Sequence, residues 1–266
     1  METKHILSLS YGKDSTALLL YIIKHKLPLD HIIHCQIMFN KEISGEHPKM
    51  AEWIPQAEKR INKLLKDNGY NCQIENITAK KNFCEQFYTV KQRGGFKGDK
   101  YGFPFTIGAW CNGRLKLDPI DNYIKKFKKD FAIVQYVGIA SDEPKRIAKL
   151  RERESSKLKF ITLEDFGITE LEAMEMCRQE DLLSPKYENS FRAGCWFCIK
   201  QSMWDLYCLY KDYPKYFQML VDMQKDSFNP FKPNKDLYKI KKEFDSGKIP
   251  KNRSVKIQQL SMFEKI

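Results

Sequence analysis

Residues 6–16, ILSLSYGKDST, decide the fold expected of this chain. The apolar residues 6–9 predict a short buried strand, and Asp14 or Ser15 can cap the helix that follows. Gly12 lies in the turn between them, where the lack of a side chain lets the backbone approach a ligand. The stretch therefore predicts a strand, a turn and a helix, which is the first half of a βαβ unit.

The same turn has the chemistry of an anion-binding site. A helix N-terminus presents unbonded N–H groups and a partial positive charge, which suit a phosphate. Ser10 and Ser15 add hydroxyls, and Lys13 adds a cation. Neither G-x-x-x-x-G-K-[ST] nor G-x-G-x-x-G occurs, so the turn is neither a Walker site nor a dinucleotide fingerprint. An ordinary strand-to-helix turn with a good cap remains the alternative.

Strand and helix patterns alternate through the first part of the chain. Apolar residues at 31–39, 72–77 and 132–139 predict further buried strands, and beyond about residue 168 helices dominate. This alternation predicts right-handed βαβ units. The expected fold is α/β, an open, mostly parallel, doubly wound sheet with a helical C-terminal part. Helices are expected at residues 50–65, 120–129, 170–180, 203–210 and 214–224.

Three consecutive parts are predicted along the chain. Residues 1–165 form the α/β domain that carries the phosphate-binding turn. Residues 166–228 form a helical region that carries cysteines, and residues 229–266 form a basic, loosely packed tail.

Composition limits the class of protein. The chain has 46 Lys and Arg against 34 Asp and Glu, a formal net charge of +12 that favours polyanionic partners such as nucleotides or nucleic acid. Its longest apolar run, residues 17–23, is about a third of a membrane span, so no membrane association is expected. Eight cysteines without a secretory leader predict a cytoplasmic protein whose clustered thiols serve metal binding or redox chemistry.

Cys195 and Cys198 have the C-x-x-C spacing that directs two thiolates to one metal. This spacing does not distinguish an iron–sulfur cluster from zinc. Cys177, on the helix before the pair, and Cys208, on the helix after it, are candidate further ligands, and Cys177 is preferred. The alternative is that these two are small buried hydrophobic residues.

Five motifs, in order along residues 6–200, resemble the phosphoadenosine phosphosulfate reductase-like branch of the ATP pyrophosphatase (PP-loop, adenine nucleotide α-hydrolase) superfamily. Residues 10–15 resemble its SGGxDS loop, with Tyr11 in place of the first glycine. The other four motifs are Phe39-Asn40 followed by GEHP at 45–48, AWCNGRLK at 109–116, GIASDEPKR at 138–146 and GCWFC at 194–198.

The resemblance implies that residues 1–165 form a PP-loop domain that binds ATP with Mg²⁺ and cleaves it between the α- and β-phosphates. An adenylated acceptor, with DNA or RNA as a candidate, would then be attacked by a sulfur or nitrogen nucleophile. A sulfur-donor protein such as a cysteine desulfurase is an implied partner. The implied catalytic residues are Lys13, Asp14, Arg114 and Lys116. The implied nucleotide contacts are Ser10, Tyr11, Gly12, Lys13, Asp14, Ser15, Thr16, Phe39, Glu46, Gly138, Asp142 and Arg146.

The resemblance also favours a [4Fe–4S] cluster over zinc. Cluster-binding relatives have a Cys-Cys pair before the Arg-x-Lys element, and here Trp110 replaces the first cysteine while Cys111 retains the second. The implied ligand set is Cys111, Cys177, Cys195 and Cys198.

Two other functions remain open. A sulfonucleotide (PAPS or APS) reductase is the first, but such enzymes use a cysteine near the C-terminus to attack the sulfate sulfur, and this chain has none after Cys208. The second is a nucleotide- or nucleic-acid-binding module that kept the fold without the chemistry.

Basic and aromatic residues also alternate near the C-terminus. Such a mixture suits a nucleic-acid backbone and stacked bases, and it equally suits a solvated helix with one buried stripe. The residues are Phe231, Lys232, Lys235, Tyr238, Lys239, Lys241, Lys242 and Phe244.

Overall fold

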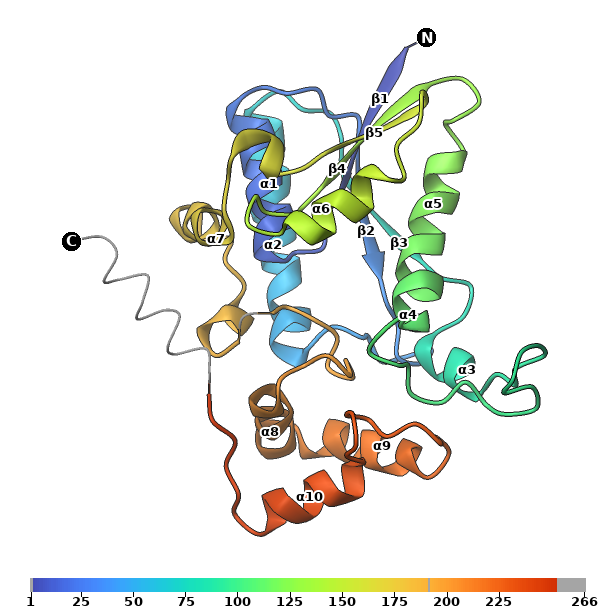
Figure 1. Cartoon of the computed structure of the whole chain (residues 1–266). Coiled ribbons are helices and arrows are strands. Elements are labelled where there is room, and N and C mark those ends of the chain that lie inside the picture. Colours follow the sequence, from blue (N-terminus) through green and yellow to red (C-terminus); the bar gives the residue numbers. More distant parts are fainter. Residues whose placement is uncertain (1, 191, 253–266) are drawn as a thin grey trace. The chain divides into compact units, whose positions relative to one another are not determined.

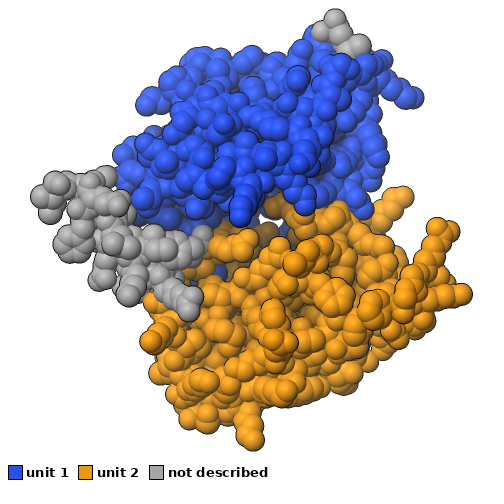
Figure 2. Space-filling view, viewed as in Figure 1, with its two compact units in different colours: residues 1–36, 49–78, 117–187 blue, residues 37–48, 79–116, 188–266 orange. Residues whose placement is uncertain are grey.

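The structure is a computed structural model that describes residues 2–190 and 192–252. Residues 253–266, the end of the predicted basic tail, lie outside this description. The chain folds into two compact units, coloured separately in Figure 2. Unit 1 comprises residues 1–36, 49–78 and 117–187, and unit 2 comprises residues 37–48, 79–116 and 188–266.

Unit 1 is built on a five-stranded sheet in which every strand pair is parallel, with the order β3-β2-β1-β4-β5 (Figure 1). Ile6 of the central strand pairs with His31 on one side and with Gln135 on the other. The predicted parallel α/β sheet is confirmed. The strands are β1 (Thr3–Ser8), β2 (His31–Gln36), β3 (Ile74–Thr78), β4 (Ala132–Val137) and β5 (Leu158–Ile161).

Helices flank the sheet. Apolar side chains of α5 and α6, such as Ile124 and Leu150, pack with strand residues such as Ile6 and Ile133 in one buried cluster. Figure 1 shows α1 and α2 on the opposite side of the sheet, as right-handed crossovers require, and α7 beside α1. The helices are α1 (Lys13–Lys24), α2 (Pro48–Asp67), α5 (Asp118–Lys125), α6 (Pro144–Arg151) and α7 (Glu170–Gln179).

The strand order reverses direction at β1. From β1 the chain moves through β2 to β3 on one side, whereas β4 and β5 lie on the other. In open α/β sheets, ligands bind outside the carboxyl ends of the strands at such a switch point. The turn after β1 and the loop after β4 both lie at this end, so the fold places the predicted phosphate-binding turn at the expected position.

Unit 2 is helical and has its own aromatic core, which includes Phe83, Trp196 and Phe217. Phe231 and Phe244 are buried in the same core, so residues 229–252 pack more tightly than the sequence suggested. The helices of this unit are α3 (Phe83–Tyr88), α4 (Trp110–Asn112), α8 (Met203–Asp212), α9 (Pro214–Gln224) and α10 (Leu237–Asp245).

Short helical turns complete the described chain: a π-helical turn at Gly113–Leu117 and 3₁₀ turns at Glu164–Phe166 and Pro185–Glu188. No helix within residues 2–190 and 192–252 combines the length and the apolar character that crossing a bilayer requires.

Candidate functional site

The turn after β1 leaves backbone donors available. Gly12 precedes α1 in an extended conformation, and no side chain caps the helix, so the predicted cap by Asp14 or Ser15 is wrong. The Ser15 hydroxyl instead accepts a hydrogen bond from the Ser10 backbone N–H at 3.0 Å. Among the described residues, the backbone N–H groups of Gly12, Asp14 and Ser15 have no hydrogen-bond partner. Three donors at a helix N-terminus can receive an anion.

The loop after β4 packs directly on this turn. A β-carbon at Gly138 would lie 2.4 Å from the Ser15 backbone nitrogen and 2.7 Å from the Asp14 carbonyl carbon. Real side chains do not tolerate such distances, so glycine alone allows this approach. Gly138 therefore joins the carboxyl ends of β1 and β4 into one site.

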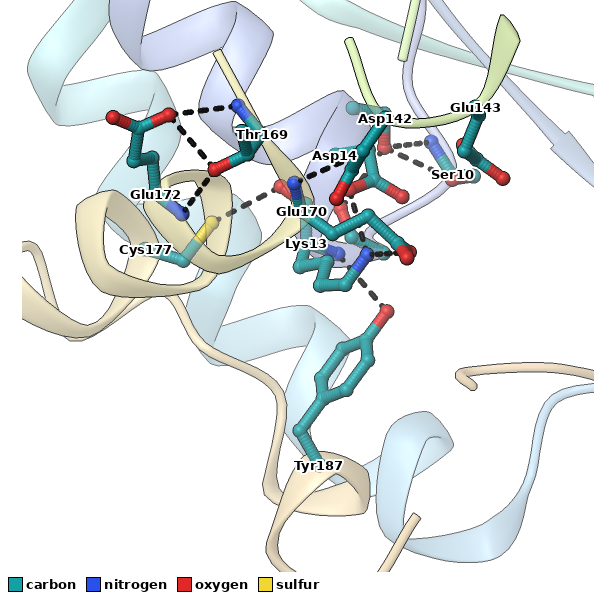
Figure 3. Close-up of polar contacts among 12 residues, drawn as sticks. Ser10, Lys13, Asp14, Asp142, Glu143, Thr169, Glu170, Glu172, Cys177 and Tyr187 are labelled. Atoms are coloured by element: carbon teal, nitrogen blue, oxygen red, sulfur yellow. Dashed lines mark hydrogen bonds and ion pairs between the residues drawn. The ribbon is translucent and has the colours of Figure 1, made fainter. Parts of the chain in front are cut away.

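Lys13 lies at the centre of the site (Figure 3). Its side chain is only 4% exposed, and its Nζ atom pairs with Asp14 at 2.7 Å and with Glu170 at 2.5 Å. Burial disfavours the charged ammonium, but the two carboxylates outweigh this effect and raise the pKa of Lys13. The Lys13 backbone N–H donates to the Tyr187 hydroxyl at 3.0 Å, so this N-terminal donor is already occupied.

Three carboxylates cluster at this site, and two of them pair with Lys13. Oxygen atoms of Asp14, Glu143 and Glu170 all lie within 4.8 Å of one another. Burial raises the pKa of Asp14, and the Glu170 and Glu143 carboxylates raise it further, against the opposing effect of Lys13. Arg146 pairs with Glu143 at 2.5 Å. These three acids outnumber the bases Lys13 and Arg146, so the cluster has a net negative charge, and carboxylate oxygens are ligands that suit a divalent cation.

The other predicted contacts of unit 1 lie at the same end of the sheet. The Asp142 carboxylate accepts a hydrogen bond from the Glu170 backbone N–H at 3.1 Å. Tyr11 has a left-handed φ of 53°, and its buried ring packs edge-on against His34 at 4.7 Å. Thr16 is buried, and its hydroxyl has no hydrogen-bond partner in the described chain. The structure thus brings together the predicted residues of unit 1.

The remaining predicted nucleotide and catalytic residues belong to unit 2. Phe39 is buried in the aromatic core, 4.5 Å from the Trp196 ring centroid. Burial raises the pKa of Glu46, and the nearby charge of Lys116 opposes that effect. Arg114 is exposed and donates from Nη2 to the Tyr101 hydroxyl at 2.6 Å.

Three cysteine thiols also converge in unit 2. Burial, with Cys198 as the next cause, raises the pKa of Cys111 to about 11. Burial raises the pKa of Cys195 well above its ordinary value, and Glu46 and the other two thiols raise it further. At least one of the distances between the three sulfur atoms exceeds 4.8 Å. Sulfur atoms that bind one tetrahedral zinc ion are roughly 3.8 Å apart, so the thiols are spaced more widely than in such a site. Metal ligation by these thiols therefore stays a prediction.

The C-x-x-C turn is anchored on both sides. The Cys198 backbone N–H donates to the Cys195 carbonyl at 3.0 Å. The Trp196 backbone N–H donates to Gly45, and its indole N–H donates to Ser44 at 2.9 Å. The loop that carries Glu46 is thereby held against the cysteines.

Cys177 has different surroundings. It is fully buried in unit 1, where its thiol donates to the Lys13 carbonyl at 3.2 Å. This is the environment that the hydrophobic alternative predicts, and ligation by Cys177 stays a prediction. Cys208 lies on α8 in unit 2 and is partly buried.

Sequence reasoning did not select Glu143, Glu170 or Tyr187 as site residues. The sequence does indicate that Glu170 is the first residue of a helix, because Thr169 and Glu172 form the capping box that begins α7. No local pattern connects Tyr187 with Lys13, because 174 residues separate them.

No protein-family model and no solved structure matches the chain. One curated protein that matches is the "Uncharacterized nin region protein ORF290" of Escherichia phage lambda, 26% identical over 212 residues. The match covers 74% of this chain and 66% of the phage protein, slightly less than two thirds of its length.

Proposed function

We propose that this chain is an ATP-dependent enzyme that cleaves ATP to AMP and pyrophosphate and adenylates an acceptor for sulfur or nitrogen transfer. The observation that carries the proposal is the turn after β1, whose Gly12, Asp14 and Ser15 amides are unbonded at the switch point of the sheet. Kinship with the adenine nucleotide α-hydrolases is part of the proposal, supported by the five motifs in order and by the parallel sheet.

In this proposal the pyrophosphate end of ATP rests on residues 10–16. An acceptor nucleophile attacks the α-phosphorus, the bond from that phosphorus to the bridging oxygen breaks, and pyrophosphate leaves with the electron pair. Catalysis is then mostly positioning and electrostatic stabilisation. The α1 amides and Lys13 offset the charge that develops on the leaving group. Lys13 exchanges a carboxylate partner for a phosphate oxygen when ATP binds.

Mg²⁺ accompanies the nucleotide in this scheme. Asp14, Glu143 and Glu170 supply the oxygen ligands, and their net negative charge favours a metal–nucleotide complex over free ATP. Arg146, now paired with Glu143, becomes a further phosphate contact. For Arg114, Lys116, Phe39 and Glu46, which belong to unit 2, a role in binding the nucleotide stays a prediction from the family resemblance alone.

The thiols of unit 2 would hold a [4Fe–4S] cluster, with zinc as the alternative. Cys111, Cys195 and Cys198 are the proposed ligands, with Cys208 of the same unit as the fourth and Cys177 as the alternative. When bound, the cluster would carry sulfur received from a donor protein such as a cysteine desulfurase, or brace the site.

The test uses α-labelled ATP with Mg²⁺ and candidate acceptors, and measures AMP and pyrophosphate. The variant Lys13→Met/Glu170→Gln removes the ammonium and one carboxylate together, which preserves the local charge balance. We expect this variant to lose at least a hundredfold in AMP formation. Lys24→Met, at the exposed end of the same helix, should be unaffected.

Three outcomes would contradict the proposal. ADP and phosphate as products would exclude cleavage of the inner anhydride. Tight ATP binding without turnover would indicate a non-catalytic module. Sulfite release from a sulfonucleotide in a thioredoxin-coupled assay would indicate a reductase.

A further inference from the structure

Three phenylalanine side chains of unit 2 are about half exposed to solvent. Phe96, Phe105 and Phe228 are 51%, 51% and 50% exposed. Together with Lys91 they form what we call the aromatic patch. Exposed aromatic side chains that gather in one place mark an interaction surface.

The three rings of the patch contact one another, and two of them share one cation. Phe96 stacks on Phe228 with the ring centroids 5.3 Å apart, and Phe105 meets Phe228 edge-on at 6.2 Å. The Lys91 Nζ atom lies 4.6 Å from the Phe228 centroid and 4.9 Å from that of Phe96. The patch therefore presents aromatic ring surfaces and a positive charge next to each other.

A hairpin holds Phe96 in place. Residues 89–101 form a short antiparallel ladder in which Tyr101 donates to Thr89 at 3.0 Å and Lys91 donates to Asp99 at 2.8 Å. The tip turns through Gly94 and Gly98, whose φ angles of +83° and +95° suit glycine. The hairpin thus presents Phe96 from an ordered turn.

The hairpin is also positively charged. Residues 89–101 contain four basic residues and one acid, a formal charge of +3. Lys100 pairs with Asp226 at 2.9 Å, so its charge is balanced. The positive charge beside the rings therefore comes from the other basic residues of the hairpin. The bases are Lys91, Arg93, Lys97 and Lys100, and the acid is Asp99.

We propose that the aromatic patch binds single-stranded nucleic acid, with bases stacked on the phenylalanine rings and phosphates paired with the hairpin bases. Aromatic platforms interleaved with cations are the usual means of holding single strands, whereas a duplex keeps its base faces covered. Insertion into a lipid bilayer fits less well, because the rings would carry the Lys91 ammonium into hydrocarbon.

Single-stranded nucleic acid would then be the acceptor in the proposed function. The binding itself does not depend on that function, whereas adenylation and modification of the strand do. Nucleic-acid binding is thereby also assigned to other residues than the basic C-terminal stretch suggested by sequence. Phe231 and Phe244 there are only 1% and 4% exposed, so Tyr238, at 49%, is the one aromatic residue of that set available for stacking.

The test measures binding of labelled 20-mers to the full chain by fluorescence anisotropy, without ATP. The nucleic-acid probes are single-stranded DNA, single-stranded RNA and duplex DNA, and binding to anionic lipid vesicles is measured separately by co-sedimentation. We expect Phe96→Ala/Phe105→Ala/Phe228→Ala to bind single strands at least tenfold more weakly than the unmodified chain. Tyr238→Ala, a matched exposed aromatic on α10, should bind as the unmodified chain does. Lys91→Gln should reduce the slope of the logarithm of the binding constant against the logarithm of the salt concentration by about one, because one phosphate contact is lost.

Circular dichroism and thermal melting of each variant separate lost binding from lost folding. Equal affinity for duplex and single strand, equal binding by the triple variant and Tyr238→Ala, or binding only to anionic vesicles would each overturn the inference. Binding without AMP formation would instead contradict the proposed function and leave this surface established.

Discussion

A β-carbon on Gly138 would lie 2.4 Å from the backbone nitrogen of Ser15, closer than any side chain can approach. This contact fixes the loop after β4 on the first turn of α1. The segments that follow β1 and β4, on the two sides of the switch point, are therefore packed together. The donors proposed to hold pyrophosphate depend on a residue 123 positions away.

Gly138→Ala should disrupt this site. The added methyl group must displace the backbone of Asp14 and Ser15, at a cost of about 1–3 kcal/mol in unfolding free energy. We expect ATP affinity, measured by calorimetry, to fall at least tenfold. Gly95→Ala is the control, because a β-carbon there meets no atom within 4 Å. Unchanged ATP affinity in Gly138→Ala would show that the nucleotide binds elsewhere.

Glu170→Gln should weaken the response to Mg²⁺. It removes one of three clustered carboxylates, so the Mg²⁺ concentration that half-saturates ATP binding should rise about tenfold. Glu175→Gln, on the same helix and paired with Arg178 at the surface, should leave that concentration unchanged. Equal Mg²⁺ dependence in the two variants would contradict metal binding by the carboxylates.

Cysteine variants separate the metal site from the packing of unit 1. Cys198→Ala should lose bound metal, measured by elemental analysis after anaerobic purification. Cys177→Ala should keep it and lose about 1 kcal/mol of stability, because its thiol is buried and bonded to the Lys13 carbonyl. If Cys177→Ala loses the metal and Cys208→Ala retains it, Cys177 is the fourth ligand.

Asp30 should make part of the stability depend on pH. Burial alone would raise its pKa, but the His5 backbone N–H at 2.8 Å and Lys4 at 3.2 Å outweigh that effect and lower the pKa. Because the folded pKa lies below the unfolded value near 4, the stabilisation is full above pH 4 and is lost as pH falls through the folded pKa.

Asp30→Asn should accordingly lower the free energy of unfolding by about 1 kcal/mol at pH 7, measured in urea. The difference from the unmodified chain should shrink below pH 4. Glu52→Gln, an exposed carboxylate on α2, provides the control. A difference that stays constant from pH 7 to pH 3.5 would contradict the assignment.

Local patterns sufficed for the central part of the fold. The strand, turn and helix at residues 6–16 were predicted because apolar periodicity and the glycine lie within one short stretch. β5 was not predicted, because its four residues are too few for a clear apolar pattern and include Lys159. This segment forms a strand through its pairing with β4, which the local sequence does not show. For the basic C-terminal stretch, the sequence left open a solvated helix with one buried stripe, and α10 has that form, with Leu237, Ile240 and Phe244 buried.

The division into units depends on contacts distant in sequence. The predicted boundaries after residues 165 and 228 cut the chain into consecutive parts, whereas each observed unit combines three separated segments. Residues 37–48 follow β2 and residues 79–116 follow β3, and both contribute to unit 2. The pairing of Lys13 with Glu170 is equally distant, so the sequence predicted the phosphate-binding turn without the acids around it.

The most direct measurement of the central claim is a crystal structure with α,β-methylene ATP and Mg²⁺, because this analogue resists cleavage at the inner anhydride and needs no acceptor. We expect the β- and γ-phosphates to accept hydrogen bonds from the Gly12, Asp14 and Ser15 amides, and Lys13 to contact a phosphate oxygen. Nucleotide bound away from residues 10–16, or phosphates directed away from those amides, would contradict that claim.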